Sequence, residues 1–224
     1  MPSVTLQIGT ELIEPSEEVR NLGIIFDSQM SMCAHITGLC KSISFQLRNV
    51  SRIRRFLDQD TCHLIIRSLV LSRLDYGNAL LLGINKSDLT RLQRLQNWAA
   101  KLIFCANKYD HVTPFLKELH WLPINERIQF KIILFVFKCI NNIGPSYLAS
   151  MLSLYSPTRT GLRSSTDSTR LQEHRIHHGT LQSAANRSFY FSAPKLWNTL
   201  PPALRSVASV NVFKKQLKSH MFPL

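Results

Sequence analysis

The carboxylates of this chain are not spaced as metal-dependent chemistry on nucleic acid requires. Polymerases and nucleases hold Mg²⁺ between two or more converging carboxylates, yet the sequence contains no Asp-Asp pair. Asp58 and Asp60 are the closest aspartates, and Asp58 precedes a helical pattern, where it suits an N-cap. Glu17 and Glu18 precede a predicted strand and are typical of a solvated turn. We therefore expect no catalytic carboxylate pair in the chain.

Histidine and cysteine also form no recognisable metal or nucleophile motif. His174, His177 and His178 are the only histidine cluster and have no cysteine near them, whereas a zinc site needs four N or S ligands, usually in paired spacings. Cys33 and Cys40 are too far apart for a zinc knuckle. The sequence has no nucleophile elbow and no glycine-rich phosphate loop. We expect no metal, no cofactor and no catalytic residue, although a Ser/His/Asp or Cys/His site assembled only by the fold stays open.

Positive charge is the chemical feature that stands out, with a net charge of +13. Residues 1–30 hold one Arg against five carboxylates, so the start of the chain is acidic. Residues 31–108 hold twelve Lys and Arg against four carboxylates, residues 109–155 are near balance, and residues 156–224 hold ten against two. Such a surplus favours an anionic partner, which means nucleic acid, an acidic protein or an anionic membrane surface.

Two predicted helices carry part of this charge as stripes of one sign. With a step of 100° per residue, the apolar residues of 31–56 fall on one side of the helix. The opposite side carries Lys41, Arg48, Arg52 and Arg55, with Phe45 beside them. In the helix over 86–106 the corresponding stripe is Arg91, Arg94 and Lys101, with Trp98 at its edge.

No acid interrupts either stripe, whereas the polar face of a helix usually mixes both signs. The stripes therefore predict contacts with the phosphates of nucleic acid, and an aromatic side chain beside them can stack on a base. For Phe45 and Trp98, packing against a neighbouring helix is expected rather than stacking on a base. The alternative for both stripes is the solvated outer face of a helical bundle.

The apolar periodicity predicts a mainly α chain. Strands are expected over 4–8, 11–14 and 19–26, and helices over 31–56, 59–74, 86–106, 112–119 and 124–142. A last helix is expected to have an apolar face formed by Phe213, Leu217 and Met221. Residues 156–170 are typical of a loop, and residues 171–191 are compatible with two short strands.

The cysteines and the apolar runs predict where the chain resides. Five cysteines form no even disulfide framework, so we expect reduced thiols and a nuclear or cytoplasmic location. The amino terminus does not resemble a signal peptide. The strongest apolar run, 132–137, is too short to span a bilayer, so we expect no membrane partner.

Several segments, in the same order along the chain, resemble one known family. They are VRNLGIIFD (19–27), LQRLQNWAAKLI (92–103), LHWLPINERIQFKI (119–132), GPSYLASML (144–152), TGLRSS (160–165) and FSAPKLWNTLPPALRSVASVNVFKKQLKSHMF (191–222). Together they resemble the carboxyl-terminal part of non-LTR (LINE-type, CR1/L2/jockey-like) retrotransposon reverse transcriptases. The resemblance covers nearly the whole chain.

The resemblance implies a fold class and a division into domains. It implies a helical, thumb-like bundle with a small N-terminal β-meander and a short mixed C-terminal region. Residues 1–27 would be a remnant of the palm strands, 28–108 a basic thumb-like helical domain, 109–155 a helical extension, and 156–224 a linker and C-terminal region. In the family the metal-binding Asp pair of the palm lies upstream, together with an endonuclease, so no catalytic residue carries over to this chain.

Three functional hypotheses follow. The first is a non-catalytic fragment of a reverse transcriptase that binds an RNA/DNA duplex or a template–primer through phosphate contacts, independently of sequence. In a full-length relative its partners would include the palm and endonuclease domains. The second is a host-adopted helical module that binds a protein and has no nucleic-acid role. The third, an enzyme with a cryptic site, has the least support.

Overall fold

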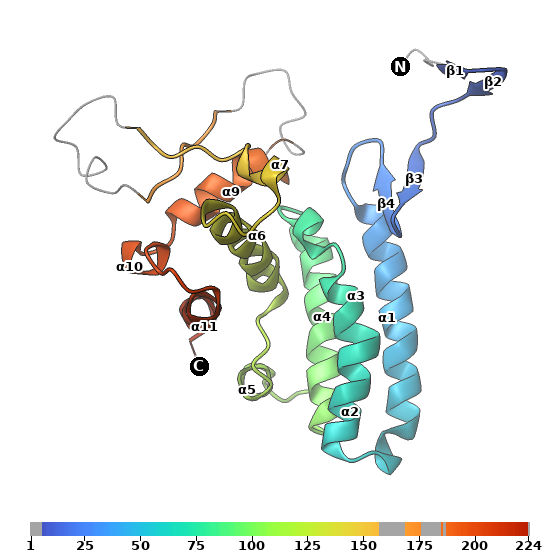
Figure 1. Ribbon diagram of the computed structural model, residues 1–224. Coiled ribbons are helices and arrows are strands. Elements are labelled where there is room, and N and C mark those ends of the chain that lie inside the picture. The colour runs from blue at the N-terminus through green and yellow to red at the C-terminus, as the bar shows by residue number, and fades with distance from the viewer. Residues whose placement is uncertain (1–5, 157–168, 176–184, 186, 224) are drawn as a thin grey trace.

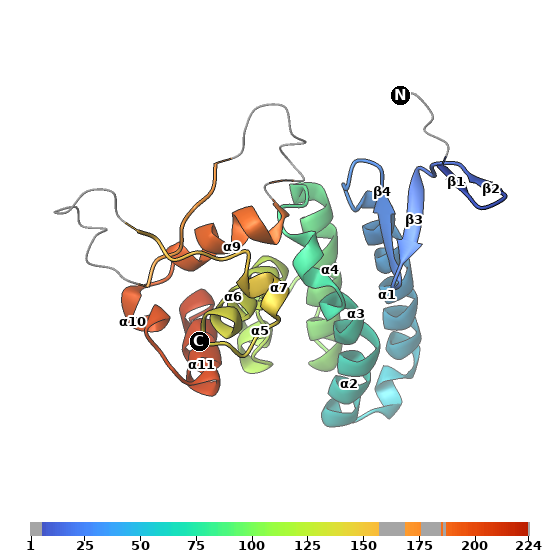
Figure 2. The ribbon, with the colours of Figure 1, turned by 45° about the horizontal axis from the view of Figure 1, so that its top comes forward.

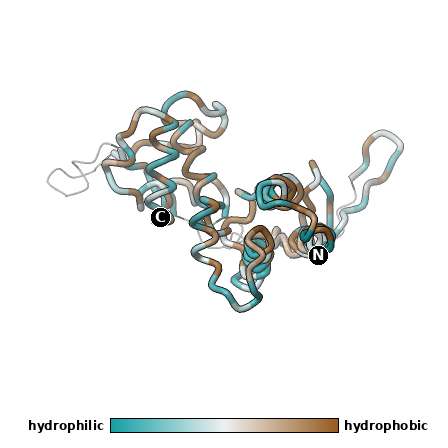
Figure 3. The backbone as a smooth tube through the Cα atoms, turned by 90° about the horizontal axis from the view of Figure 1, so that it is seen from below, coloured by the Kyte–Doolittle hydropathy of each residue, from teal (hydrophilic) through white to brown (hydrophobic). Residues whose placement is uncertain are grey.

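The computed structural model describes residues 6–156, 169–175, 185 and 187–223. The protein is mainly α-helical, with a small β region at the amino terminus, as predicted (Figure 1). Seen from below, the helices form two groups, one on the side of the amino terminus and one on the side of the carboxyl terminus (Figure 3). No helix of the described residues combines the length and the apolar character that crossing a membrane requires.

The β region consists of two antiparallel hairpins. Strand β1 (Leu6–Ile8) pairs with β2 (Glu11–Ile13), and β3 (Glu18–Asn21) pairs with β4 (Ile24–Asp27). The single strand expected over 19–26 is wrong, because the backbone turns within it. Leu22 and Gly23 have φ angles of 47° and 82°, and two consecutive residues with positive φ form the tight connection of a hairpin. The β1–β2 hairpin projects away from the helices (Figures 1 and 2).

The carboxylate of Asp27 connects the second hairpin to the first helix, α1 (Cys33–Ile53). It accepts hydrogen bonds from the backbone N–H groups of Ser31 and Met32, both at 2.7 Å, and from the Ser31 hydroxyl at 2.9 Å. Burial alone would raise the pKa of Asp27, but these hydrogen bonds outweigh it and lower the pKa below its usual value. Ser31 and Met32 directly precede the helix, so these hydrogen bonds fix the backbone where the chain enters α1.

Helix α1 and two further helical segments form an up-and-down bundle (Figure 1). After a 3₁₀ turn at Arg54–Phe56, the second segment runs through α2 (Gln59–Ile66), a π-helical turn (Arg67–Leu71) and α3 (Ser72–Asp75), and a 3₁₀ turn (Asn78–Leu81) leads to α4 (Lys86–Ile103). The helices expected over 31–56, 59–74 and 86–106 are thereby confirmed.

Asp58 caps α2 as predicted, and Asn85 caps α4. The Asp58 carboxylate accepts a hydrogen bond from the backbone N–H of Thr61 at 3.3 Å. The side-chain oxygen of Asn85 accepts one from the N–H of Asp88 at 2.7 Å. These caps satisfy N–H groups that a helix leaves unpaired at its amino end, which explains why α2 and α4 begin where they do.

The C-terminal group of helices packs around one central helix. Its members are α5 (Thr113–Glu118), α6 (Ile124–Ile140), α7 (Ser146–Ala149), α9 (Phe189–Asn198), α10 (Pro202–Arg205) and α11 (Val210–Met221). Helix α6 contacts α4 on one side and α7, α9 and α11 on others. That position explains its almost wholly apolar sequence, because a helix surrounded by other helices has little surface left for polar residues.

Aromatic side chains hold α6, α9 and α11 together. Phe137 and Phe213 stack with ring centroids 4.1 Å apart, and Trp197 lies 5.9 Å from Phe213. All three are fully buried, and the Trp197 indole N–H donates to the Thr169 carbonyl at 2.9 Å. Leu217, also fully buried, completes the face predicted for the last helix, and Met221 at its end is half-buried.

The sequence of residues 171–191 is compatible with two short strands, but the structure describes only part of this stretch. Leu171 forms an isolated antiparallel bridge with Leu154, and α9 already begins at Phe189. Residues 176–184 and 186 lie outside the described residues, as does most of the expected loop over 156–170. The described part of this stretch therefore holds one bridge and the start of a helix.

Candidate nucleic-acid interface

Helices α1 and α4 lie side by side and run in the same direction (Figure 1). Near their starts, the guanidinium of Arg91 lies 3.4 Å from the Thr37 hydroxyl. Near their ends, the guanidinium of Arg54 reaches the carbonyls of Leu102 and Ile103. Because the contacts follow the same order along both helices, the basic stripes of the two helices are also parallel.

Arg54 is the residue that fixes this pairing, and it was not among the predicted site residues. Its guanidinium donates to the Leu102 carbonyl at 2.8 Å, to the Ile103 carbonyl at 2.7 Å and to the Leu57 carbonyl at 2.6 Å. The first two carbonyls belong to the last turn of α4. Carbonyls in this turn have no N–H donor within the helix, and they form the negative end of the helix dipole. A signal existed in the sequence: with the 100° step, Arg54 falls on the apolar side of α1, away from the stripe formed by its neighbours.

The five residues predicted on α1 are all exposed. Lys41, Arg48, Arg52 and Arg55 point away from the core, as the helical periodicity requires, and Phe45 is 56% exposed. Phe45 is therefore not a core residue, and its ring remains available beside the cations. Arg55 lies over the ring of its exposed neighbour Phe56, with the guanidinium carbon 4.6 Å from the ring centroid.

The three cations predicted on α4 differ from one another. Arg91 forms an ion pair with Asp88 at 2.8 Å and is half-buried. Burial alone would raise the pKa of Asp88, but hydrogen bonds from Arg91, Asn85 and Cys33 lower it. Arg94 is exposed, and the Lys101 ammonium donates to the Lys108 carbonyl at 2.6 Å, which leaves its other two hydrogens free.

A groove of about 850 Å³ opens between the ends of α1 and α4. Four cationic side chains line it, and among the described residues no carboxylate does. The lining consists of Ser51, Arg54, Arg94, Asn97, Trp98, Lys101, Leu102, Cys105, Ala106 and Lys108. Arg54 is engaged by carbonyls, so Arg94, Lys101 and Lys108 are the cations that an anion in the groove would meet, and the half-buried Trp98 forms part of the wall.

The α1 stripe borders this groove. Ser51, which lines the groove, is three residues after Arg48, so Arg48 neighbours it on the helix surface. Arg55 lies in the 3₁₀ turn that follows α1 and is adjacent in sequence to Arg54, which also lines the groove. The structure thus brings Arg48, Arg55, Arg94 and Lys101 to one face of the bundle. Of the other predicted site residues, Lys41, Phe45 and Arg52 lie further around the exposed side of α1, and Arg91 is held by Asp88.

Among the described residues, no three His, Cys, Asp or Glu side chains gather as a metal site would require. Of the histidine cluster, His177 and His178 lie outside the described residues. The His174 ring stacks on Tyr190 at 4.0 Å, and its Nδ1 lies 2.9 Å from the Tyr190 hydroxyl.

The chain matches no protein-family model, no curated protein and no solved structure.

Proposed function

We propose that the chain binds the backbone of a nucleic-acid duplex through the α1–α4 face, as the non-catalytic, thumb-like part of a non-LTR retrotransposon reverse transcriptase. The observation that carries the proposal is the groove between the two helices. Its three available cations, Arg94, Lys101 and Lys108, have no carboxylate beside them among the described lining residues, and two further arginines stand at its border.

A phosphate backbone is the anion that best fits this arrangement. The cations are spread along two parallel helices rather than gathered around one point, so several phosphates can be neutralised at once. Exposed Lys and Arg side chains contribute through counterion release, which is independent of base sequence and decreases as salt is added. The proposed partner is therefore an RNA/DNA duplex or a template–primer, bound without sequence preference.

The family resemblance supports the same surface. The segment over 92–103, one of those that resemble reverse transcriptases, contains Arg94, Trp98 and Lys101. In polymerases the thumb lies against the template–primer duplex, so a cationic groove is expected there. In a full-length relative, the palm and endonuclease domains would supply the chemistry, and the proposal assigns no reaction to this chain.

The proposal predicts how binding depends on salt. If Arg48, Arg55, Arg94, Lys101 and Lys108 each neutralise one phosphate, the slope of log K against log salt is about −4.5 for a B-form duplex, a loss of about 500-fold between roughly 50 and 200 mM. Fluorescence anisotropy with a labelled RNA/DNA hybrid and with a DNA duplex measures this slope. Binding that is insensitive to salt, or absent at low salt, contradicts the proposal.

Paired variants locate the contacts. Replacing Arg94 and Lys101 with Gln should reduce the slope by about 2 units, about one unit for each lost phosphate contact. Replacing Lys214 and Lys215 of α11 with Gln removes the same charge from a helix outside the α1–α4 face, and the slope should stay within measurement error. An equal loss in both variants would show general polycation binding instead. Primer extension by the chain would contradict its non-catalytic role, and stoichiometric capture of one protein without nucleic-acid binding would favour the interaction-module hypothesis.

A further inference from the structure

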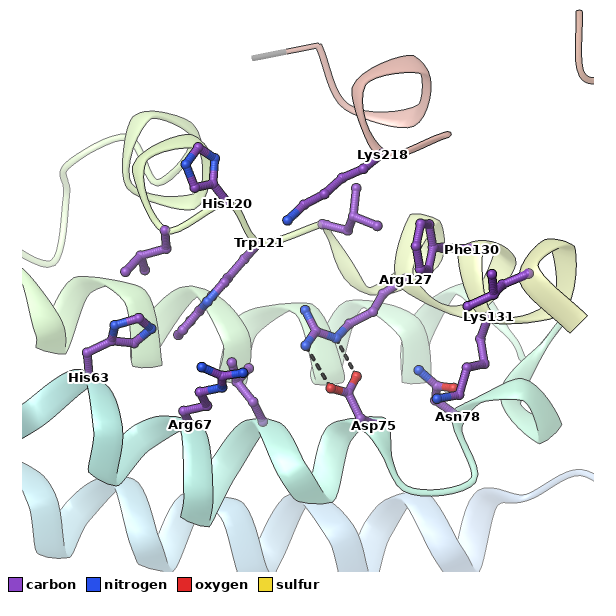
Figure 4. A pocket seen from close by; sticks show the side chains of 14 residues that line it. His63, Arg67, Asp75, Asn78, His120, Trp121, Arg127, Phe130, Lys131 and Lys218 are labelled. Atoms are coloured by element: carbon purple, nitrogen blue, oxygen red, sulfur yellow. Dashed lines mark hydrogen bonds and ion pairs between the residues drawn. The ribbon is translucent and has the colours of Figure 1, made fainter. Parts of the chain in front are cut away.

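A second basic site lies away from the α1–α4 groove. It is a pocket of about 410 Å³ between the α2–α3 segment, the connection from α5 to α6, helix α6 and helix α11 (Figure 4). This volume lies within the range of small-molecule sites. Three separate stretches of the sequence, 63–78, 119–134 and the region of Lys218, meet here, so the pocket joins the N-terminal bundle to the C-terminal helices.

The pocket has more positive charge than its own carboxylate can neutralise. Its cations are Arg67, Arg127, Lys131 and Lys218, and Asp75 is the sole carboxylate among the described lining residues. Both oxygens of Asp75 accept from the guanidinium of Arg127, one of them at 2.8 Å, as the dashed lines in Figure 4 show. Asp75 is therefore already engaged, and three cations remain without an ion-pair partner among the described residues.

The pKa of Lys218 reflects the burial and the positive charge of this pocket. This lysine extends from α11 toward the pocket (Figure 4) and is half-buried. Burial lowers its pKa, and the nearby positive charge of Arg127 lowers it further. The fold thus holds an ammonium group where its charge is disfavoured, and the negative charge of a bound anion would offset both effects.

Asn78 provides an independent observation. It lines the pocket, is only 3% exposed, and its side-chain oxygen has no hydrogen-bond partner. A buried, unpaired polar atom is costly and calls for a partner. An anion cannot donate to this oxygen, but the amide nitrogen of the same side chain carries two N–H donors from which an anion in the pocket can accept.

We propose that this pocket binds a small phosphate-bearing anion, of the size of pyrophosphate or a nucleoside diphosphate. Arg67, Lys131 and Lys218 neutralise its charge from three different elements, and the Asn78 amide donates to it. The rings of Trp121 and His63, 5.9 Å apart, form the end of the pocket beyond Arg67 (Figure 4). Trp121 is only 6% exposed, so the base of a nucleotide would meet the half-buried His63 ring and the small exposed part of Trp121, whereas pyrophosphate would use the cationic part alone.

The proposal is independent of duplex binding by α1 and α4. The anion would contact the α2–α3 segment, α6 and α11 at once, so its binding should stabilise the association of the two groups of helices. A ligand that binds only the folded state raises the unfolding temperature as its concentration exceeds Kd. Thermal unfolding of the full chain, with pyrophosphate and with sodium chloride of equal ionic strength, therefore tests the proposal.

We expect pyrophosphate at a hundredfold excess over Kd to raise Tm by about 5 °C or more, and chloride to have little effect. An equal effect of both salts overturns the proposal. Repeating the measurement with a nucleoside diphosphate shows whether the pocket recognises a nucleotide or only a free phosphate anion. A larger shift with the nucleotide supports base contacts at Trp121, and an equal shift supports a free phosphate anion.

Variants separate a ligand-binding role from a structural one. Lys218→Met removes the disfavoured ammonium but retains the apolar stem, so Tm in chloride should stay the same or rise while the pyrophosphate shift is lost. Lys214→Met, on an exposed part of the same helix, is the matched control and should retain the shift. A retained shift in Lys218→Met, or an equal loss in the control, overturns the proposal.

A second variant keeps the test decisive if Lys218→Met does not fold. Arg67 is exposed and makes no hydrogen bond or ion pair among the described residues, so Arg67→Gln should fold normally. Isothermal titration with pyrophosphate should show one site per chain and at least tenfold weaker binding in this variant. The Arg94 and Lys101 double variant of the groove should bind pyrophosphate like the unaltered chain, and weakened binding there would place the anion in the groove instead.

Discussion

Three arginines within four residues at the end of α1 have different structural roles, and substitution at Arg54 tests that difference. Arg54→Met would remove three hydrogen bonds from a charged donor to the carbonyls of Leu57, Leu102 and Ile103. Hydrogen bonds to charged groups contribute about 1.5–3 kcal/mol each, but carbonyls that water can reach recover part of that. Arg54 is half-buried, so we take about 1 kcal/mol for each bond. The expected loss in the free energy of unfolding is about 3 kcal/mol.

Urea unfolding followed by circular dichroism measures this loss, and in a thermal scan it corresponds to a decrease in Tm of roughly 6–12 °C for a chain of this size. Arg52→Met is the matched control, because Arg52 is exposed on the same helix and makes no hydrogen bond among the described residues. The control should change stability by no more than about 0.5 kcal/mol. Arg54→Lys should recover part of the loss, because an ammonium cannot reach all three carbonyls in the geometry of a guanidinium.

The contrast between the two arginines decides the outcome. If Arg54→Met and Arg52→Met destabilise the chain equally, Arg54 does not anchor α4 to α1 and the reasoning is refuted. If Arg54→Met is destabilising but Arg54→Lys is fully stable, charge alone is sufficient and the hydrogen-bond geometry is not required.

Two further predictions concern residues that connect elements of the fold. Asp27→Asn should cost about 1 kcal/mol at neutral pH, because a neutral amide replaces the charged acceptor of the hydrogen bonds from Ser31 and Met32. Because the folded-state pKa of Asp27 is lowered, this contribution is present above its unfolded pKa and disappears as pH falls through the folded pKa. Urea unfolding at several pH values checks this, and a difference between the two proteins that persists in strong acid contradicts it. Trp197→Ala should cost about 3–5 kcal/mol, because a fully buried indole is lost from its contact with Phe213; a loss below about 1 kcal/mol by the same measurement would show that this part of the core is not required.

Local signals predicted most of the helices of the bundle. The caps at Asp58 and Asn85 lie where α2 and α4 begin, because hydrogen bonds within three residues along the chain do not depend on the rest of the fold. The i, i+4 spacing of Phe213 and Leu217 predicted the buried face of α11 for the same reason. The hairpin over 18–27 escaped prediction, because Leu22 is apolar and a leucine with positive φ is uncommon.

Some features of the candidate sites follow from the sequence, and others depend on how the helices pack. Periodicity alone placed the predicted α1 cations on an exposed face, because the apolar stripe opposite them must be buried. It could not show that Arg91 is paired with Asp88, nor that Arg54 rather than Arg55 holds the end of α4, since those partners are set by how two helices pack. The pocket around Lys218 could not be predicted from the sequence, because its walls come from three separate stretches, of which the first and the last are more than a hundred residues apart. Only the folded chain brings their charges together.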